Sequence, residues 1–84
     1  MFYTHTRRGD RIRLFPTPQA AQAQAADGQA IHAVAVHLDG YARCLTPLDK
    51  PVSGADAGWR APVEVHDDGS VTADGTIPEK FFVN

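Results

Sequence analysis

The sequence has a single cysteine, Cys44, and no apolar run that approaches the length of a membrane span. One cysteine cannot form a disulfide within the chain, which excludes the disulfide-stapled scaffolds typical of small secreted proteins. A transmembrane helix needs about 20 consecutive apolar residues, so we expect no membrane segment. Both absences favour a cytoplasmic protein that acts without a membrane.

Neither sign of charge is in large excess, since the net charge is −2 and the isoelectric point is about 6.0. Proteins that bind nucleic acids or anionic membranes usually carry a basic surplus, so this balance argues against both classes. The distribution is uneven, because residues 1–13 hold four arginines and residues 62–84 hold five acidic residues. We favour an arrangement in which the two ends lie on neighbouring strands and neutralise each other. The alternative is that one end recruits a partner.

Turn-forming dipeptides are the strongest local signal in the sequence. Asp-Gly occurs four times, at residues 27–28, 39–40, 68–69 and 74–75. Glycine adopts positive φ without steric cost, so these pairs suit the tight turns that join antiparallel strands. They predict two hairpins, residues 30–38 with 41–46 and residues 63–66 with 70–73. In the second hairpin Val63 and Val65 alternate with polar residues, which predicts one buried and one solvated face.

An insert rich in alanine and glutamine, residues 17–28, interrupts this β pattern. Thr17 is a good helix N-cap, Pro18 suits the first helical position, and Gly28 suits a helix end. These signals predict a short helix at about residues 18–27. A flexible loop between two strands is the alternative.

Three further segments have the pattern of strands, and they lie at residues 2–6, 11–15 and 80–83. With the hairpins they predict one small domain over residues 1–84. Its fold class is mostly β, a small barrel or curled antiparallel sheet of five or six strands with at most one short helix.

The sequence contains no convergent motif for catalysis or metal binding. The four histidines are not spaced as ligands, because His32 and His37 face opposite sides of one predicted strand, and neither C-x-x-C nor H-E-x-x-H occurs. Cys44 would need a neighbouring base to act as a nucleophile, and a cysteine in a strand is more often a small buried apolar residue. We therefore predict a protein that is not an enzyme and has no cofactor or metal.

The predicted role is that of a binding or assembly module whose partner is another protein or a copy of itself. The candidate contact residues are Arg7, Arg11, Arg13, Trp59 and Arg60. The arginines would supply charge complementarity, and the tryptophan would supply an apolar anchor of the kind found at interface hot spots. The alternative is a small nucleic-acid-binding β-barrel, in which the N-terminal arginines contact phosphates and nearby aromatic residues stack on bases.

The turn and strand at residues 9–14, Gly-Asp-Arg-Ile-Arg-Leu, resemble the opening of SH3-like small β-barrels. That resemblance implies a barrel, although the alanine-rich insert is not part of the minimal SH3-like pattern. The whole chain, with its Asp-Gly hairpins and a tryptophan before a valine-rich strand, is similar in style to short proteins of bacteriophages and prophages. This second resemblance implies an accessory role in the virion or in the bacterial cytoplasm, as a structural component or as a factor that binds a host protein.

Overall fold

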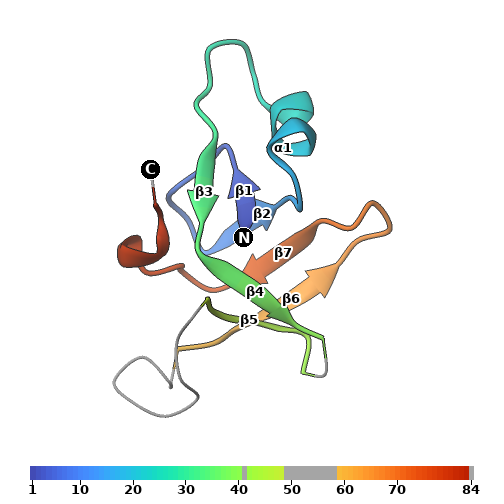
Figure 1. Ribbon diagram of the computed structural model, residues 1–84, viewed down its shortest axis with the longest axis vertical. Coiled ribbons are helices and arrows are strands. Elements are labelled where there is room, and N and C mark those ends of the chain that lie inside the picture. Colours follow the sequence, from blue (N-terminus) through green and yellow to red (C-terminus); the bar gives the residue numbers. More distant parts are fainter. Residues whose placement is uncertain (41, 49–58, 84) are drawn as a thin grey trace.

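The computed structural model describes residues 1–40, 42–48 and 59–83 (Figure 1). Within these residues the chain forms seven β-strands, one α-helix and one 3-10 helix. In chain order the elements are β1 (Phe2–Thr4), β2 (Arg11–Leu14), α1 (Pro18–Gln24), β3 (His32–Val34), β4 (Val36–Asp39), β5 (Cys44–Pro47), β6 (Ala61–Val65), β7 (Val71–Asp74) and the 3-10 helix (Glu79–Phe81). The prediction of a mostly β chain with at most one short helix is confirmed.

The strands form two antiparallel sheets, and the chain passes directly from one sheet to the other. The larger sheet has the order β2-β7-β6-β5-β4, and in the smaller sheet β1 pairs with β3. β3 leads into β4 across one residue, Ala35, and Tyr3 exchanges backbone hydrogen bonds of 2.9 and 2.7 Å with Phe15 at the end of β2. The strands therefore curl around the core, and over the described part of the chain they do not close into one barrel. A curled antiparallel sheet was one of the two predicted arrangements.

Seven strands form, where five or six were predicted. The segments expected at residues 2–6, 11–15, 41–46, 63–66 and 70–73 contribute one strand each, and the strand expected at residues 30–38 is divided at Ala35 into two. The Ala35 N–H donates to the Phe81 carbonyl at 2.7 Å, and the Ala35 carbonyl accepts from the Leu48 N–H at 3.0 Å. The first bond joins Ala35 to the C-terminal segment, and the second continues the β4–β5 register by one pair. Both backbone polar groups of Ala35 are thus satisfied at the point where the chain changes sheets.

Both predicted hairpins form. In the first, β4 pairs with β5 from Val36 opposite Pro47 to Asp39 opposite Cys44. The connection is longer than the Asp-Gly pair alone, and among its described residues the positive φ is that of Arg43, at 52°, whereas Gly40 does not have one. Tyr41, which the sequence placed at the start of the returning strand, lies outside the described residues.

In the second hairpin β6 pairs with β7, so that Val63 lies opposite Ala73 and Val65 lies opposite Val71. Val71 is fully buried, but Val65 is 44% exposed, so the prediction of a buried face is wrong at this end of β6. The reason is the length of the neighbouring strand. Within the described residues, β5 pairs with only the first two residues of β6.

The alanine-rich insert contains α1, which confirms the helix over the flexible loop. The Thr17 hydroxyl accepts a hydrogen bond from the Ala20 N–H at 3.1 Å, as an N-cap should, and Pro18 is the first helical residue. The helix is shorter than the range 18–27 and ends at Gln24. It packs against β1 with Ala21 fully buried. No helix in the described ranges is long and apolar enough to cross a membrane.

The prediction of a last strand at residues 80–83 is wrong. Glu79–Phe81 is a 3-10 helix, and only Phe82 makes a β-bridge, with Val34. Phe81 and Phe82 are consecutive and both buried. Consecutive residues of a strand point to opposite faces, whereas a tight helical turn followed by an extended residue can direct both rings into one core.

The main core lies between the curled strands. It is built from residues that are at most 8% exposed: Ile12, Leu14, Val34, Val36, Leu45, Ala61, Val71, Ala73, Ile77, Phe81 and Phe82. Because the strands contribute from their inner faces, the outer faces and the strand edges carry the polar groups available for function.

Candidate functional site

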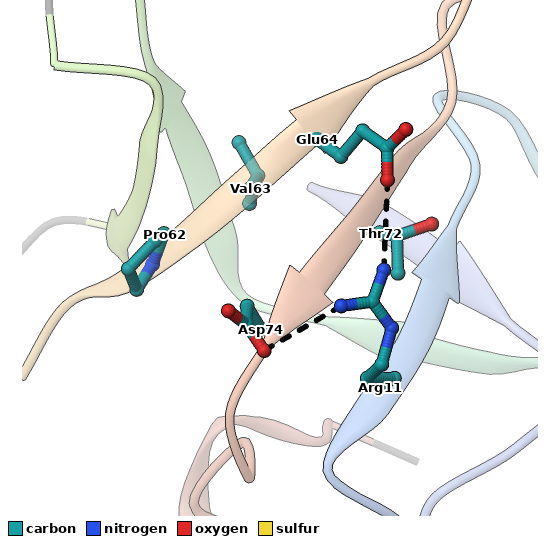
Figure 2. A pocket seen from close by; sticks show the side chains of 6 residues that line it. All are labelled: Arg11, Pro62, Val63, Glu64, Thr72 and Asp74. Carbon is teal, nitrogen blue, oxygen red and sulfur yellow. Dashed lines mark ion pairs between the residues drawn. The ribbon is translucent and has the colours of Figure 1, made fainter.

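Arg11 lies in an open hollow on the outer face of the larger sheet (Figure 2). The hollow has a volume of about 260 Å³ and is lined by Arg11, Pro62, Val63, Glu64, Thr72 and Asp74. The Arg11 guanidinium lies 3.5 Å from the Glu64 carboxylate and 3.6 Å from the Asp74 carboxylate, so it bridges β6 and β7. All three side chains are more than half exposed. The hollow therefore lacks the water-excluded surroundings in which paired carboxylates become effective acids and bases.

Arg13 lies on the same exposed face of β2 and joins a network at the β6–β7 turn. Its Nη2 donates to Asp68 Oδ2 at 2.8 Å, and its Nε donates to Ser70 Oγ at 2.9 Å. Asp68 Oδ1 accepts from the Ser70 backbone N–H at 2.9 Å and from the Ser70 hydroxyl at 2.5 Å. The hydroxyl and then the N–H of Ser70, with a smaller contribution from Arg13, lower the pKa of Asp68 below its ordinary value. The network ties β2 to the turn of the neighbouring hairpin.

Arg7 and Trp59 both contact the C-terminal segment. Arg7 forms an ion pair with Glu79, and its guanidinium carbon lies 4.9 Å from the centre of the Phe82 ring. The Trp59 ring lies against Phe81 with 4.8 Å between ring centres and a tilt of 38°. Because Phe81 is a core residue, Trp59 acts as an anchor of the fold at this position.

Arg60 lies just before β6 and forms an ion pair with Asp39 at the end of β4. The five candidate contact residues are thus distributed over three places: the exposed face of β2, the C-terminal segment and the β4–β5 hairpin. Arg7, Arg11 and Arg13 each pair with an acidic residue of the C-terminal part of the chain. This confirms the prediction that the two charged ends neutralise each other.

The residues considered for metal binding and nucleophilic catalysis are not brought together. Over residues 1–40, 42–48 and 59–83, no group of three or more His, Cys, Asp or Glu side chains is placed to hold a metal ion. Cys44 is half-buried, its Sγ donates to the Ala42 carbonyl at 3.4 Å, and the residue opposite it on β4 is Asp39. No imidazole is directly across the described part of the hairpin from the thiol.

Among the described residues, no strand pairs with the outer half of β6 on the side away from β7, and we call this side its free edge. The bond from the His66 N–H to the Ser70 carbonyl, at 2.8 Å, makes Val65 and Val71 a non-hydrogen-bonded pair of the antiparallel ladder. In such a pair the N–H and C=O groups point away from the partner strand. The Val65 backbone groups are therefore directed to the side where β5 would have to continue. In Figure 1 the β6–β7 hairpin extends away from the β4–β5 turn.

The turn after β4 limits this edge. The Val63 N–H donates to the Arg43 carbonyl at 3.0 Å, which is the last bond between the β5 side and β6 within the described ranges. Arg43 itself has a left-handed backbone, with a φ of 52°. Among the described residues, the unpaired edge is therefore short and is centred on Val65, between Val63, which is bonded to Arg43, and the turn at residues 67–68.

The chain was compared with models of protein families, with curated proteins and with solved structures. No match was found in any of the three. The function is therefore inferred from the geometry of the chain itself.

Sequence reasoning did not find the free edge. The pattern at Val63 and Val65 is the pattern of a half-buried strand, and it contains no sign that the neighbouring strand stops after two pairs. The last bond between that neighbour and β6 in the described ranges is at Arg43, a residue type that rarely adopts a positive φ. Only the pairing register between distant segments reveals it.

Proposed function

We propose that this chain is a non-catalytic module that binds another protein or copies of itself, and that it does so by strand addition at the edge of β6. The free edge around Val65 is the observation that supports this. Unpaired backbone groups on an edge strand are a template for another strand, whose main-chain hydrogen bonds supply affinity. The exposed Val65 side chain adds an apolar contact on the same edge.

The ion pairs of the arginines favour protein binding over the nucleic-acid alternative. Arg7, Arg11 and Arg13 are the basic residues that would meet phosphates, and each already has a carboxylate partner in this chain. A phosphate would have to displace that carboxylate, and the released acid would then repel the nucleic acid. Much of the electrostatic gain that drives nucleic-acid binding would be lost.

A more specific role, that of an accessory protein of a bacteriophage or prophage, stays a prediction. It rests on the general resemblance of the sequence to short phage proteins. Neighbouring genes would test it. Genes for capsid or tail proteins beside this one would favour a virion component, and regulatory genes would favour a factor that binds a host protein.

The module itself is tested with wild-type protein and a Val65→Lys substitution. Both proteins are examined by sedimentation velocity up to about 1 mM, the range in which weak edge contacts become populated. Both are also immobilised as baits for proteins of the native source. We expect either concentration-dependent association or a specific captured chain, in each case lost with Val65→Lys. The proposal is overturned if wild-type protein stays monomeric and its bait captures the same proteins as the Val65→Lys bait.

A further inference from the structure

We propose that Asp27 is a site of spontaneous covalent modification, at which its peptide link to Gly28 rearranges to an isoaspartyl link, while the fold protects the other three Asp-Gly pairs of the chain. The inference goes beyond the proposed function, because it concerns the connection between α1 and β3 and not the β6 edge. It is carried by the different surroundings of four identical dipeptides.

The rearrangement begins when the Gly28 backbone nitrogen attacks the side-chain carboxyl carbon of Asp27. A C–N bond forms, the carboxyl hydroxyl leaves with the N–H proton as water, and a succinimide ring closes. Water then breaks the bond from the ring nitrogen to the Asp27 main-chain carbonyl carbon, so that the chain continues through the side chain and the main-chain carboxyl is free. One water is released and one is consumed, so no oxidant, reductant or other co-reactant is needed.

The attack requires a nitrogen that no hydrogen bond holds and a carboxyl group that can turn toward it. Asp27 and Gly28 are the central residues of a turn that the Gln29 N–H closes with a bond of 3.0 Å to the Ala26 carbonyl. Both are exposed, and glycine hinders the approach least because it has no side chain. Over the described ranges, neither the Asp27 carboxylate nor the Gly28 N–H has a hydrogen-bond or ion-pair partner. In Figure 1 this connection extends beyond the strands.

Two of the other Asp-Gly pairs have a nitrogen that is already bonded. The Gly69 N–H donates to the His66 carbonyl at 3.1 Å, and the Gly75 N–H donates to the Asp10 carbonyl at 2.8 Å. Each bond keeps the proton on the nitrogen and fixes the nitrogen in the turn, so it has to break before the ring can close. A bond of this kind slows the reaction by a factor of roughly 2 to 10.

Two of the pairs have a carboxylate that is held. Asp39 forms an ion pair with Arg60. Asp68 is bonded to the hydroxyl and the N–H of Ser70 and to Arg13, and these contacts lower its pKa. The acid form, which loses its hydroxyl as water, is therefore less populated at Asp68 than in a free aspartate. Of the four aspartates, only Asp27 has neither kind of restraint within the described part of the chain.

The rearranged link changes the turn that joins α1 to β3. An isoaspartyl link adds one carbon atom to the main chain between Asp27 and Gly28. The Gln29 side chain spans this turn, since its Oε1 accepts from the Ala26 N–H at 2.9 Å and its Nε2 donates to the His5 carbonyl at 3.1 Å. The longer main chain moves Gln29 relative to Ala26, so the modified protein loses this tie between the turn and the segment after β1.

The test is to incubate wild-type protein at neutral pH, native and unfolded in urea, until half of the unfolded Asp27–Gly28 links have rearranged. Both samples are then digested with an endoproteinase that cleaves before aspartate but not before isoaspartate. Rearrangement at Asp27 leaves peptide 10–38 uncut, and each of the other three sites gives a different uncut peptide. We expect peptide 10–38 to accumulate at similar rates in both samples, and the other uncut peptides to accumulate roughly 2 to 10 times more slowly in native protein than in urea.

Two substitutions locate the modification independently. Asp27→Glu and Asp74→Glu keep the charge, and a glutamate reacts far more slowly because it would have to close a larger ring. Total isoaspartate in the native proteins is measured by methyl transfer from S-adenosylmethionine with an isoaspartyl methyltransferase. Asp27→Glu should lose most of the methyl acceptance of wild type, whereas Asp74→Glu, the matched control, should retain it, and circular dichroism should show both folded.

The proposal is overturned if native protein rearranges first at another site, at equal rates at all four sites, or not at all while the unfolded sample does. Methyl acceptance that Asp27→Glu does not lower would overturn it as well. The proposed function is decided separately, by the comparison of wild type with Val65→Lys.

Discussion

Arg13 and Asp68 form an ion pair of 2.8 Å that joins β2 to the turn between β6 and β7. The two residues are 55 positions apart in the chain, and both also bond to Ser70. The pair therefore fixes how the second hairpin sits on the N-terminal strand. Because that hairpin carries the free edge, the network sets the position of the proposed interface.

The ionised form of Asp68 should stabilise the fold in a pH-dependent way. Its native pKa is lowered by the bonds from Ser70 and by Arg13, whereas the unfolded value is about 3.9. The stabilisation is thus complete above about pH 5 and is lost as the pH falls through the native pKa. We expect the difference in free energy of unfolding between wild type and Asp68→Asn, measured with urea, to be largest near neutral pH and to shrink in acid. A difference independent of pH would contradict the assignment.

Two glycines that follow aspartate should respond differently to alanine. Gly69 has a φ of +86°, where an alanine side chain is strained, whereas Gly40 does not have a left-handed φ. Apart from its chain neighbours, no atom of the described residues lies within 4 Å of a Cβ built at Gly40, so that site has room for a methyl group. We expect Gly69→Ala to lower the free energy of unfolding by about 1–2 kcal/mol, and Gly40→Ala to leave it unchanged or slightly higher. Thermal and urea unfolding measure both variants. If Gly69→Ala and Gly40→Ala lowered the stability equally, the backbone at the two turns would not be as described.

The Thr46 hydroxyl offers a stabilising substitution. Its Oγ1 is buried and has no hydrogen-bond partner among the described residues, which costs free energy in the native state. Thr46→Val keeps the shape and removes the unsatisfied group, and we expect a gain of about 1 kcal/mol in urea unfolding. Thr72→Val is the matched control. Thr72 Oγ1 is 2.7 Å from His66 Nε2, so the same substitution there removes a hydrogen bond instead of an unsatisfied hydroxyl. A Thr46→Val protein less stable than wild type would refute the prediction.

Local features of the fold were predictable from the sequence, and features that depend on distant segments were not. The Thr17 cap, Pro18 and the Asp-Gly turns act over a few residues, so α1 and both hairpins could be placed. The exposure of Val65 depends on where β5 ends, and the turn at Phe81 depends on a core that the strands build together. The opposite charges of the two chain ends predicted that they neutralise each other. Which arginine pairs with which acidic residue depends on the strand register, which the sequence does not show. For the same reason the candidate contact residues could be named while the free edge could not.

Trp59 should report on the docking of the C-terminal segment. It is the one tryptophan of the chain, and its ring lies against Phe81. We expect Phe81→Leu to shift the fluorescence maximum to longer wavelength under native conditions and to lower stability by about 1–2 kcal/mol. Phe15→Leu is the control, since Phe15 is equally buried but is not part of the core cluster that packs against Trp59. It should lower stability without moving the native emission, and a shift with both substitutions would indicate general loosening instead of a local contact.

Oligonucleotide binding separates the two proposed classes of partner. Because the N-terminal arginines are paired within the chain, we expect a fluorescent single-stranded DNA or RNA to bind with a dissociation constant weaker than about 0.1 mM at about 150 mM salt. Anisotropy measured over a range of salt concentrations checks this. Tighter binding that weakens steeply with salt and disappears when Arg11→Glu and Arg13→Glu are combined would favour the nucleic-acid alternative, because only phosphate contacts by these side chains account for both effects. Val65→Lys adds positive charge at the β6 edge and should not lose any such binding, so the same titration shows which surface of the larger sheet is in use.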